Sequence, residues 1–144
     1  MADVQKMSSQ SSDLQASDIY QFYARQTHLI DSGRHADWAS TFLDEGEFHS
    51  PTYPEPAIGK DALVGISQAF AETALAANEV RRHIMTNIWI RQTNAGLCKV
   101  ECVLLVTATS SDCTRVLRTM NITDDLAYQS GFWKVNYRVV RATP

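Results

Sequence analysis

One histidine and one aspartate could together move protons. His83 stands near the start of residues 81–92, where β-branched and aromatic residues predict a strand. An imidazole titrates near neutral pH, which suits general acid/base catalysis, and a neighbouring carboxylate would orient its ring. Asp31 is the best-placed carboxylate, provided that the helix preceding it crosses the start of this strand. A hydrogen-bonded histidine of the core is the alternative interpretation of His83.

The first expected helix puts Asp31 in its last turn. Ser17 or Asp18 can cap this helix, which runs to Ser32 with apolar side chains at helical spacing. Gly33 is suited to end it in a left-handed conformation. A carboxylate at a helix C-terminus is mildly unfavourable beside the helix dipole. Asp31 in this place is therefore consistent with a cationic partner across a cavity.

Two more helices and a short strand are expected before the strand of His83. The second helix covers residues 35–42, a turn covers residues 44–46, and a strand covers residues 47–50. A proline-rich loop follows, and a third helix spans residues 60–76 with an apolar stripe.

The C-terminal half consists of strand-like runs with short turns between them. They cover residues 81–92, 98–109, 114–126 and 132–140. Long strands joined by short loops predict an antiparallel meander, and helices followed by strands predict an α+β fold with the helices on one face. A sheet of this length must curl, so we expect a cone with a pocket between the first helix and the sheet.

The alternation along residues 81–92 leaves the direction of His83 open. One face would carry His83, Met85, Asn87 and Trp89. The other would carry Arg82, Ile84, Thr86, Ile88 and Ile90. The second face is the more apolar, so the pattern alone slightly favours it as the buried one.

Several aromatic residues could belong either to the pocket or to the core. Tyr20 and Tyr23 lie on the first helix, and Tyr53 lies in the proline-rich loop as a candidate pocket lid. A phenol could donate a hydrogen bond to a carbonyl as enolate charge develops. For Trp38, Phe48, Met85 and Trp89 the core is the favoured place and a pocket wall is the alternative.

The composition excludes several classes of protein. The chain has 144 residues, of which 44% are hydrophobic and 20% charged, with a net charge of −3. These values are typical of one domain with a full core. There is neither a basic stripe nor a long apolar run, so we expect no nucleic-acid or membrane partner. No metal-ligand spacing occurs among the histidines and cysteines, so we expect no metal.

The N-terminal residues differ from the rest. Residues 1–14 are polar and rich in Ser and Gln, which predicts a flexible tail before a domain of residues 15–144. The tail lacks a secretory signal, and Cys98, Cys102 and Cys113 are expected to be buried reduced thiols, so we expect a cytoplasmic protein.

Short motifs in a fixed order resemble a known family. They are Ile30-Asp31-Ser32-Gly33, Asp37-Trp38-Ala39, Phe48-His49-Ser50-Pro51, Gly59-Lys60-Asp61-Ala62-Leu63, Arg82-His83-Ile84-Met85-Thr86-Asn87 and Gly131-Phe132-Trp133-Lys134-Val135. Together they resemble SnoaL-like proteins of the nuclear-transport-factor-2-like superfamily, in particular the branch of scytalone dehydratase and the polyketide dehydratases and cyclases. The resemblance implies a cone of three N-terminal helices packed on a curved antiparallel sheet.

The same resemblance implies a reaction. Enzymes of this branch use an Asp at the end of the first helix and a His at the start of a strand, and the matching positions are Asp31 and His83. It implies a cofactor-independent dehydratase, cyclase or isomerase of secondary metabolism, acting on a hydrophobic, polycyclic or aromatic carbonyl compound. We expect the substrate to be bound by Tyr23, Tyr53 and Ser50 as polar groups and by Trp38 and Met85 as walls, with Asn121 as a further candidate.

Two other functions remain open within the superfamily. The second pocket histidine of scytalone dehydratase has no counterpart, because residues 98–109 contain no histidine. The small subunits of ring-hydroxylating oxygenases share the Arg-His strand and are structural, and a non-catalytic ligand-binding or assembly protein is the third possibility. We also expect a homodimer through the outer sheet face, with Ile84, Ile88, Val116 and Val139 as candidate contacts.

Overall fold

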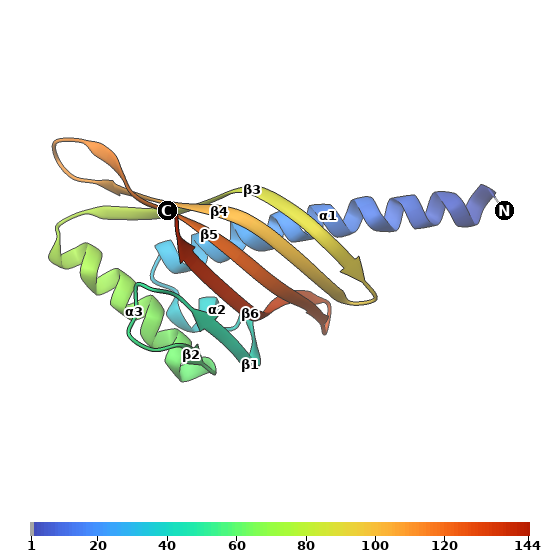
Figure 1. Ribbon diagram of the computed structural model, residues 1–144, viewed down its shortest axis with the longest axis horizontal. Coiled ribbons are helices and arrows are strands. Elements are labelled where there is room, and N and C mark those ends of the chain that lie inside the picture. The colour runs from blue at the N-terminus through green and yellow to red at the C-terminus, as the bar shows by residue number, and fades with distance from the viewer. Residues whose placement is uncertain (1) are drawn as a thin grey trace.

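Three helices and a curved sheet of six strands make up the computed structural model of the chain (Figure 1). It describes the backbone of residues 2–144 and the side chains of residues 16–91 and 93–144. The elements are α1 (Ala2–Asp31), α2 (His35–Ala39), β1 (Phe42–His49), β2 (Ala57–Ile58), α3 (Lys60–Ala76), β3 (Val80–Asn94), β4 (Leu97–Thr109), β5 (Thr114–Gln129) and β6 (Phe132–Ala142). The predicted α+β fold is confirmed.

The sheet has the strand order β2-β1-β6-β5-β4-β3. Strands β3 to β6 form the predicted antiparallel meander. Strand β1 is parallel to β6, so the sheet is mixed and the prediction of a wholly antiparallel sheet is wrong. Strands β1 and β6 stand at opposite ends of the domain sequence, which gives a parallel pair the long connection that it needs.

The first helix has no cap at Ser17 or Asp18. It is helical through both residues, so the predicted start is wrong. Its end is as predicted, because Gly33 has a φ of +74° and the Arg34 N–H donates to the Leu29 carbonyl over 3.0 Å. The predicted tail of residues 1–14 lies outside the residues whose side chains are described and stays a prediction.

The second helix is shorter than predicted. It ends at Ala39, and Phe42 already belongs to β1. Residues 44–46, predicted as a turn, lie inside that strand, where the register with β6 shifts between Phe42 and Glu47. A Cβ on Gly46 would meet the carbonyl oxygen of Val135 at 2.9 Å, so only glycine allows this close approach to β6. Turn-like residues here form a bulge in the strand.

A second bulge divides β3 at Asn87. This residue has a φ of +52°, and the register with β4 shifts between Thr86 and Trp89. Ile88 and Ile90 therefore pack against the core, whereas Trp89 is 58% exposed. The predictions of Ile88 on the outer face and of Trp89 in the core are both wrong.

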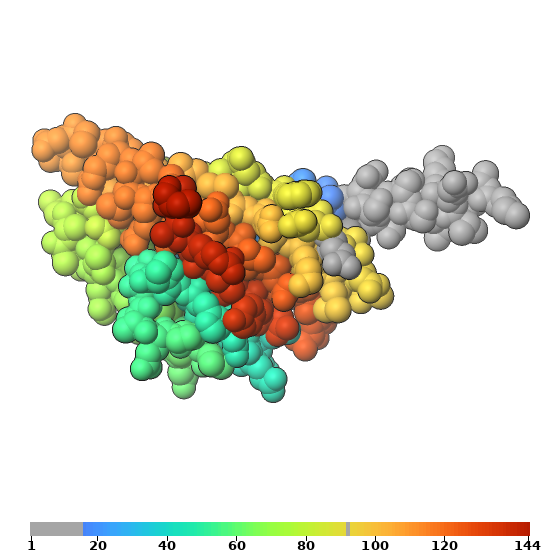
Figure 2. All heavy atoms as spheres, viewed as in Figure 1, coloured from blue at the N-terminus to red at the C-terminus, as the bar shows by residue number. Residues whose placement is uncertain are grey.

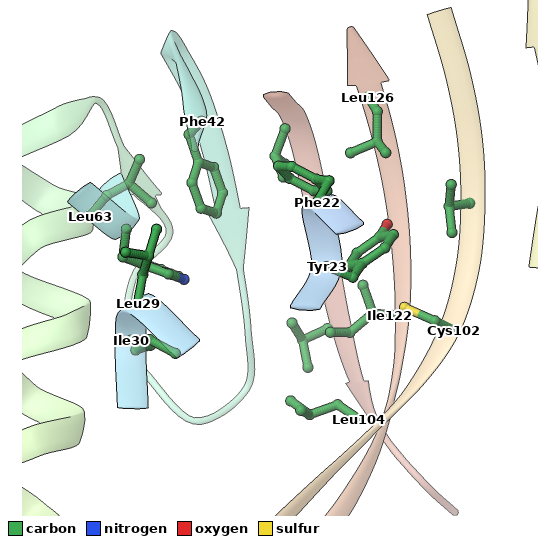
Figure 3. Close-up of a cluster of buried hydrophobic side chains, with 14 of the residues drawn as sticks. Phe22, Tyr23, Leu29, Ile30, Phe42, Leu63, Cys102, Leu104, Ile122 and Leu126 are labelled. Carbon is green, nitrogen blue, oxygen red and sulfur yellow. The ribbon is translucent and has the colours of Figure 1, made fainter. Parts of the chain in front are cut away.

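The core lies between the helices and the concave face of the sheet. Figure 3 shows Phe22 and Tyr23 of α1 lying over the sheet, with Tyr23 beside Cys102 and Ile122. Cys98 and Cys102 are buried free thiols as predicted, but Cys113 is exposed because it lies in the turn between β4 and β5. None of the helices in the described part of the chain is long and apolar enough to span a bilayer.

Figure 2 shows where the sheet ends in space. The turn between β4 and β5 (orange) extends past the end of α3 (green). The loop after β1 (teal) lies next to the C-terminal part of β6 (red). This end of the sheet holds the cavity described below, because residues of that loop, of α3 and of β5 all line it.

Candidate functional site

Asp31 and His83 are in contact. Oδ1 of Asp31 is 2.7 Å from Nδ1 of His83, and Oδ2 accepts a hydrogen bond of 2.9 Å from the backbone N–H of His83. Their side chains are 19% and 15% exposed. The first helix thus crosses the start of this strand, which was the condition for the pairing, and the carboxylate at the end of α1 has an imidazole as its partner.

The contact fixes the imidazole in orientation. When Nδ1 donates its proton to Asp31, Nε2 is the unprotonated nitrogen that can exchange a proton with a bound molecule. The ring of Phe70, from α3, packs against the His83 ring with 4.3 Å between centroids. Rotation of the imidazole is thus limited by a carboxylate on one side and an aromatic ring on another.

His83 lines a cavity of about 630 Å³, open solvent at its mouth included. Its apolar wall includes Ile30, Trp38, Phe48, Ile66, Phe70, Met85, Leu104, Val106, Met120, Ile122 and Val140. Its polar groups are Gln26, Thr27, Ser50, Thr52, Tyr53, His83, Arg118 and Arg138. The pocket predicted between α1 and the sheet is therefore present.

Tyr53 supplies a neutral hydroxyl to this cavity. Burial raises the pKa of its phenol above the ordinary value, although the nearby Arg118 guanidinium lowers it in part. The hydroxyl therefore keeps its proton at neutral pH and can donate a hydrogen bond. Ser50 lines the cavity beside Tyr53, as do the predicted wall residues Trp38 and Met85.

Two of the predicted ligand-binding residues lie away from the cavity. Tyr23 is fully buried, and its hydroxyl donates to Oδ2 of Asp124 over 2.7 Å. Its side chain does not line the cavity. Asn121 faces a separate groove on the other side of the sheet, beside Trp89 and Arg141. The helical spacing that groups Tyr23 with Asp31 says nothing about which of them reaches the pocket.

Tyr23 belongs to a buried polar network that was not predicted from the sequence. Arg138 donates to Asp124 through Nε over 2.8 Å and through Nη2 over 2.7 Å. Nη2 of Arg138 also donates to Oε1 of Gln26 over 2.7 Å. Nε2 of Gln26 in turn donates a hydrogen bond of 2.7 Å to the Thr41 hydroxyl. Each charge in the network is paired, as burial requires.

The alternation of residues along β5 contains a signal by which Arg118 and Asp124 could have been found. Residues 118, 120, 122, 124 and 126 share one face of β5, and Met120, Ile122 and Leu126 are buried. Arg118 and Asp124 are therefore charged residues at positions that the alternation assigns to the core. Charges at such positions are rare unless they are paired or functional. Within residues 16–91 and 93–144, no three His, Cys, Asp or Glu side chains gather as a metal site.

Solved structures similar to this chain come from several bacteria. Aln2 from a Streptomyces species is 26% identical, with 88% of this chain and 89% of Aln2 covered and a TM-score of 0.78. A protein from Catenulispora acidiphila, solved in complex with S-DNPA, is 27% identical, with 90% and 94% covered and a TM-score of 0.78. ActVI-ORFA from Streptomyces coelicolor, at 21% identity, 88% and 93% coverage and a TM-score of 0.78, shares the fold.

The comparison with curated proteins finds no match. The family model for the SnoaL-like domain matches residues 14–139, which is nearly the whole domain. The chain therefore belongs to the SnoaL-like domain family.

Proposed function

We propose that the protein is a cofactor-independent dehydratase, cyclase or isomerase whose Asp31–His83 pair moves a proton next to a carbonyl group. The observation that carries this proposal is the 2.7 Å contact between Asp31 and His83 at the wall of a largely apolar cavity. A base with a carboxylate behind it and an aromatic-lined space in front of it suits a hydrophobic ring ketone. The similar Catenulispora protein, which was solved with a small molecule, adds support from the same fold.

The chemical steps follow from the groups in the cavity. Nε2 of His83 takes the proton from the carbon next to the carbonyl, and the electron pair moves to the carbonyl oxygen as an enolate. The neutral phenol of Tyr53 is available to donate a hydrogen bond to that oxygen. Asp31 stabilises the imidazolium that forms. The imidazolium then returns the proton to a departing β-hydroxyl, which leaves as water, or to another carbon.

The test uses 3-hydroxy-1-tetralone, which has an acidic proton next to its carbonyl and a hydroxyl at the β-carbon. Loss of water yields 1-naphthol, which fluoresces, and proton exchange alone is read by NMR in D₂O. We expect both signals with the wild type and neither with His83→Gln. Turnover by His83→Gln at the wild-type rate would contradict the role of His83. Absence of both signals in the wild type across a series of such ketones would favour a structural or ligand-binding protein.

A second copy of the chain covers the outer sheet face in this proposal. Ile84 and Val116 are 45% and 56% exposed there, and Trp89 is 58% exposed. The groove beside Trp89 carries both Glu101 and Arg141, so two copies related by a two-fold axis can pair opposite charges across it. Sedimentation should give a dimer for the wild type and a monomer for Val116→Glu. A wild-type monomer would contradict this part.

The free thiols accord with a cytoplasmic location.

A further inference from the structure

Arg118 is a cation of the cavity wall without a carboxylate partner. Its Nε is buried and makes no hydrogen bond, and its Nη1 reaches only the Thr52 hydroxyl, at 3.4 Å. None of the ion pairs among the described side chains includes it. Arg138, the other arginine of the wall, has its guanidinium bound by both oxygens of Asp124. The two arginines therefore differ in what they can still bind.

The charged groups of the cavity differ in whether a carboxylate contacts them. Asp124 offsets Arg138, and Asp31 lies against His83. Tyr53 carries no charge at neutral pH, because burial keeps its phenol protonated. Arg118 is thus the cavity-lining cation that no carboxylate among the described side chains contacts. A buried N–H without an acceptor is destabilising, and a ligand that brings an acceptor to it would relieve that cost.

The register of the sheet relates Arg118 to the proposed base. His83 on β3 is opposite Val106 on β4, and Val106 is opposite Arg118 on β5. All three side chains line the same cavity, so they form one row across its floor. Two inter-strand steps of about 4.8 Å each put the Cα atoms of His83 and Arg118 roughly 10 Å apart. A molecule of two fused rings can bridge the row.

We propose that Arg118 binds a carboxylate of the substrate, so that the protein selects an aromatic or fused-ring carbonyl compound that carries an acidic side chain. A guanidinium binds a carboxylate through two parallel N–H groups, and no carboxylate among the described side chains occupies those of Arg118. The carboxylate fixes one end of the molecule, and the carbon that loses its proton lies near His83 at the other end. Arg118 is in this sense a specificity-determining residue, and the inference rests on the proposed function for the reaction itself.

Two probes of the same shape test the site without turnover. Calorimetric titration compares 2-naphthoate with the uncharged 2-naphthalenemethanol. We expect the wild type to bind the carboxylate at least tenfold more tightly than the alcohol. Arg118→Gln should bring the two affinities within about threefold by weakening the carboxylate alone, because one charge-assisted contact accounts for about that difference. Arg118→Lys should give an intermediate ratio, since it keeps the charge and loses the paired N–H groups.

Two controls separate this inference from the proposed reaction. Arg82→Gln removes a charge from the exposed outer side of β3 and should leave the preference unchanged. His83→Gln should keep the preference and lose turnover. A wild type that does not favour the carboxylate, or an Arg118→Gln protein that folds and still favours it, overturns the role of Arg118, whether or not the ketone is dehydrated. A preference with neither dehydration nor proton exchange leaves Arg118 in place and overturns the reaction instead.

Discussion

Asp31 binds His83 twice, through its ring at 2.7 Å and through its backbone N–H at 2.9 Å. One carboxylate thereby ties the end of α1 to β3 and orients the imidazole at the same time. The arrangement removes the unfavourable effect of a negative charge at the end of α1 by giving Asp31 two donors on a neighbouring strand.

The double contact predicts separate effects on catalysis and on stability. An amide in Asp31→Asn can still accept one of the two hydrogen bonds, but it cannot stabilise an imidazolium. We expect turnover of 3-hydroxy-1-tetralone to fall by about 10²–10⁴-fold, and the free energy of unfolding to fall by about 1–3 kcal/mol. Asp37→Asn, at an exposed pair with Arg34, is the matched control and should change neither. Equal turnover in both variants would contradict the role of Asp31.

The buried ion pair between Arg138 and Asp124 predicts a large loss of stability when one partner is removed. Arg138→Met leaves the Asp124 carboxylate buried with the Tyr23 hydroxyl as its remaining side-chain donor. We expect the free energy of unfolding in urea to fall by about 3–5 kcal/mol. Arg34→Met breaks an exposed pair and should cost no more than about 1 kcal/mol. A similar small loss in both variants would mean that the network contributes little.

Alkaline stability should depend on the buried thiols. Burial raises the pKa of Cys98 to about 11 and that of Cys102 to about 12, from 9.0. The folded state therefore holds these protons more tightly than the unfolded chain. Their contribution is complete below pH 9.0 and is lost as the pH rises through the two raised values. Unfolding in urea at increasing pH should show a decline that is shallower in the Cys98→Ala/Cys102→Ala protein.

Thiol labelling checks the same assignment independently. In the folded protein at neutral pH, only the exposed Cys113 should react with a thiol reagent, and Cys113→Ser should abolish the fast reaction. All three thiols should react after unfolding. Fast labelling of Cys102 in the folded protein would contradict its burial.

The bulge in β3 predicts a preference at Asn87. Its φ of +52° is easy for glycine and costs a β-branched residue about 1–2 kcal/mol. Asn87→Val should lower the melting temperature, and Asn87→Gly should leave it unchanged or raise it. Differential scanning calorimetry of the two variants gives the comparison, and equal melting temperatures would show that the strand can take the valine without the bulge.

Much of the fold was predictable because the signals are local. The apolar spacing of residues 60–76 and the turn residues between long strands define α3 and the meander. The position of Asp31 at a helix end and of His83 at the start of a strand, together with the family resemblance, led to the expectation of their contact. Errors arose where the backbone departs from regular geometry. Turn-like residues at Asp44–Gly46 form a bulge against β6, which no local pattern reveals.

The rest of the site depends on which strands are neighbours. Asp124 and Arg138 are opposite each other only because β5 pairs with β6 in one register. Arg118 comes to the same row as His83 only because β4 lies between their strands. The side chain of Tyr23 suits a pocket, but its position along α1 keeps it away from the cavity. Sequence spacing alone does not show which residues on one face of a helix reach the cavity.

The bulge at Asn87 gives the two halves of β3 different surroundings. Met85, which precedes the bulge, lines the cavity. Ile88 and Ile90, which follow it, pack against the hydrophobic core. A substitution at Met85 can therefore change the cavity while the packing of Ile88 and Ile90 stays as it is. A single asparagine with a positive φ separates the part of the strand that lines the cavity from the part that packs only in the core.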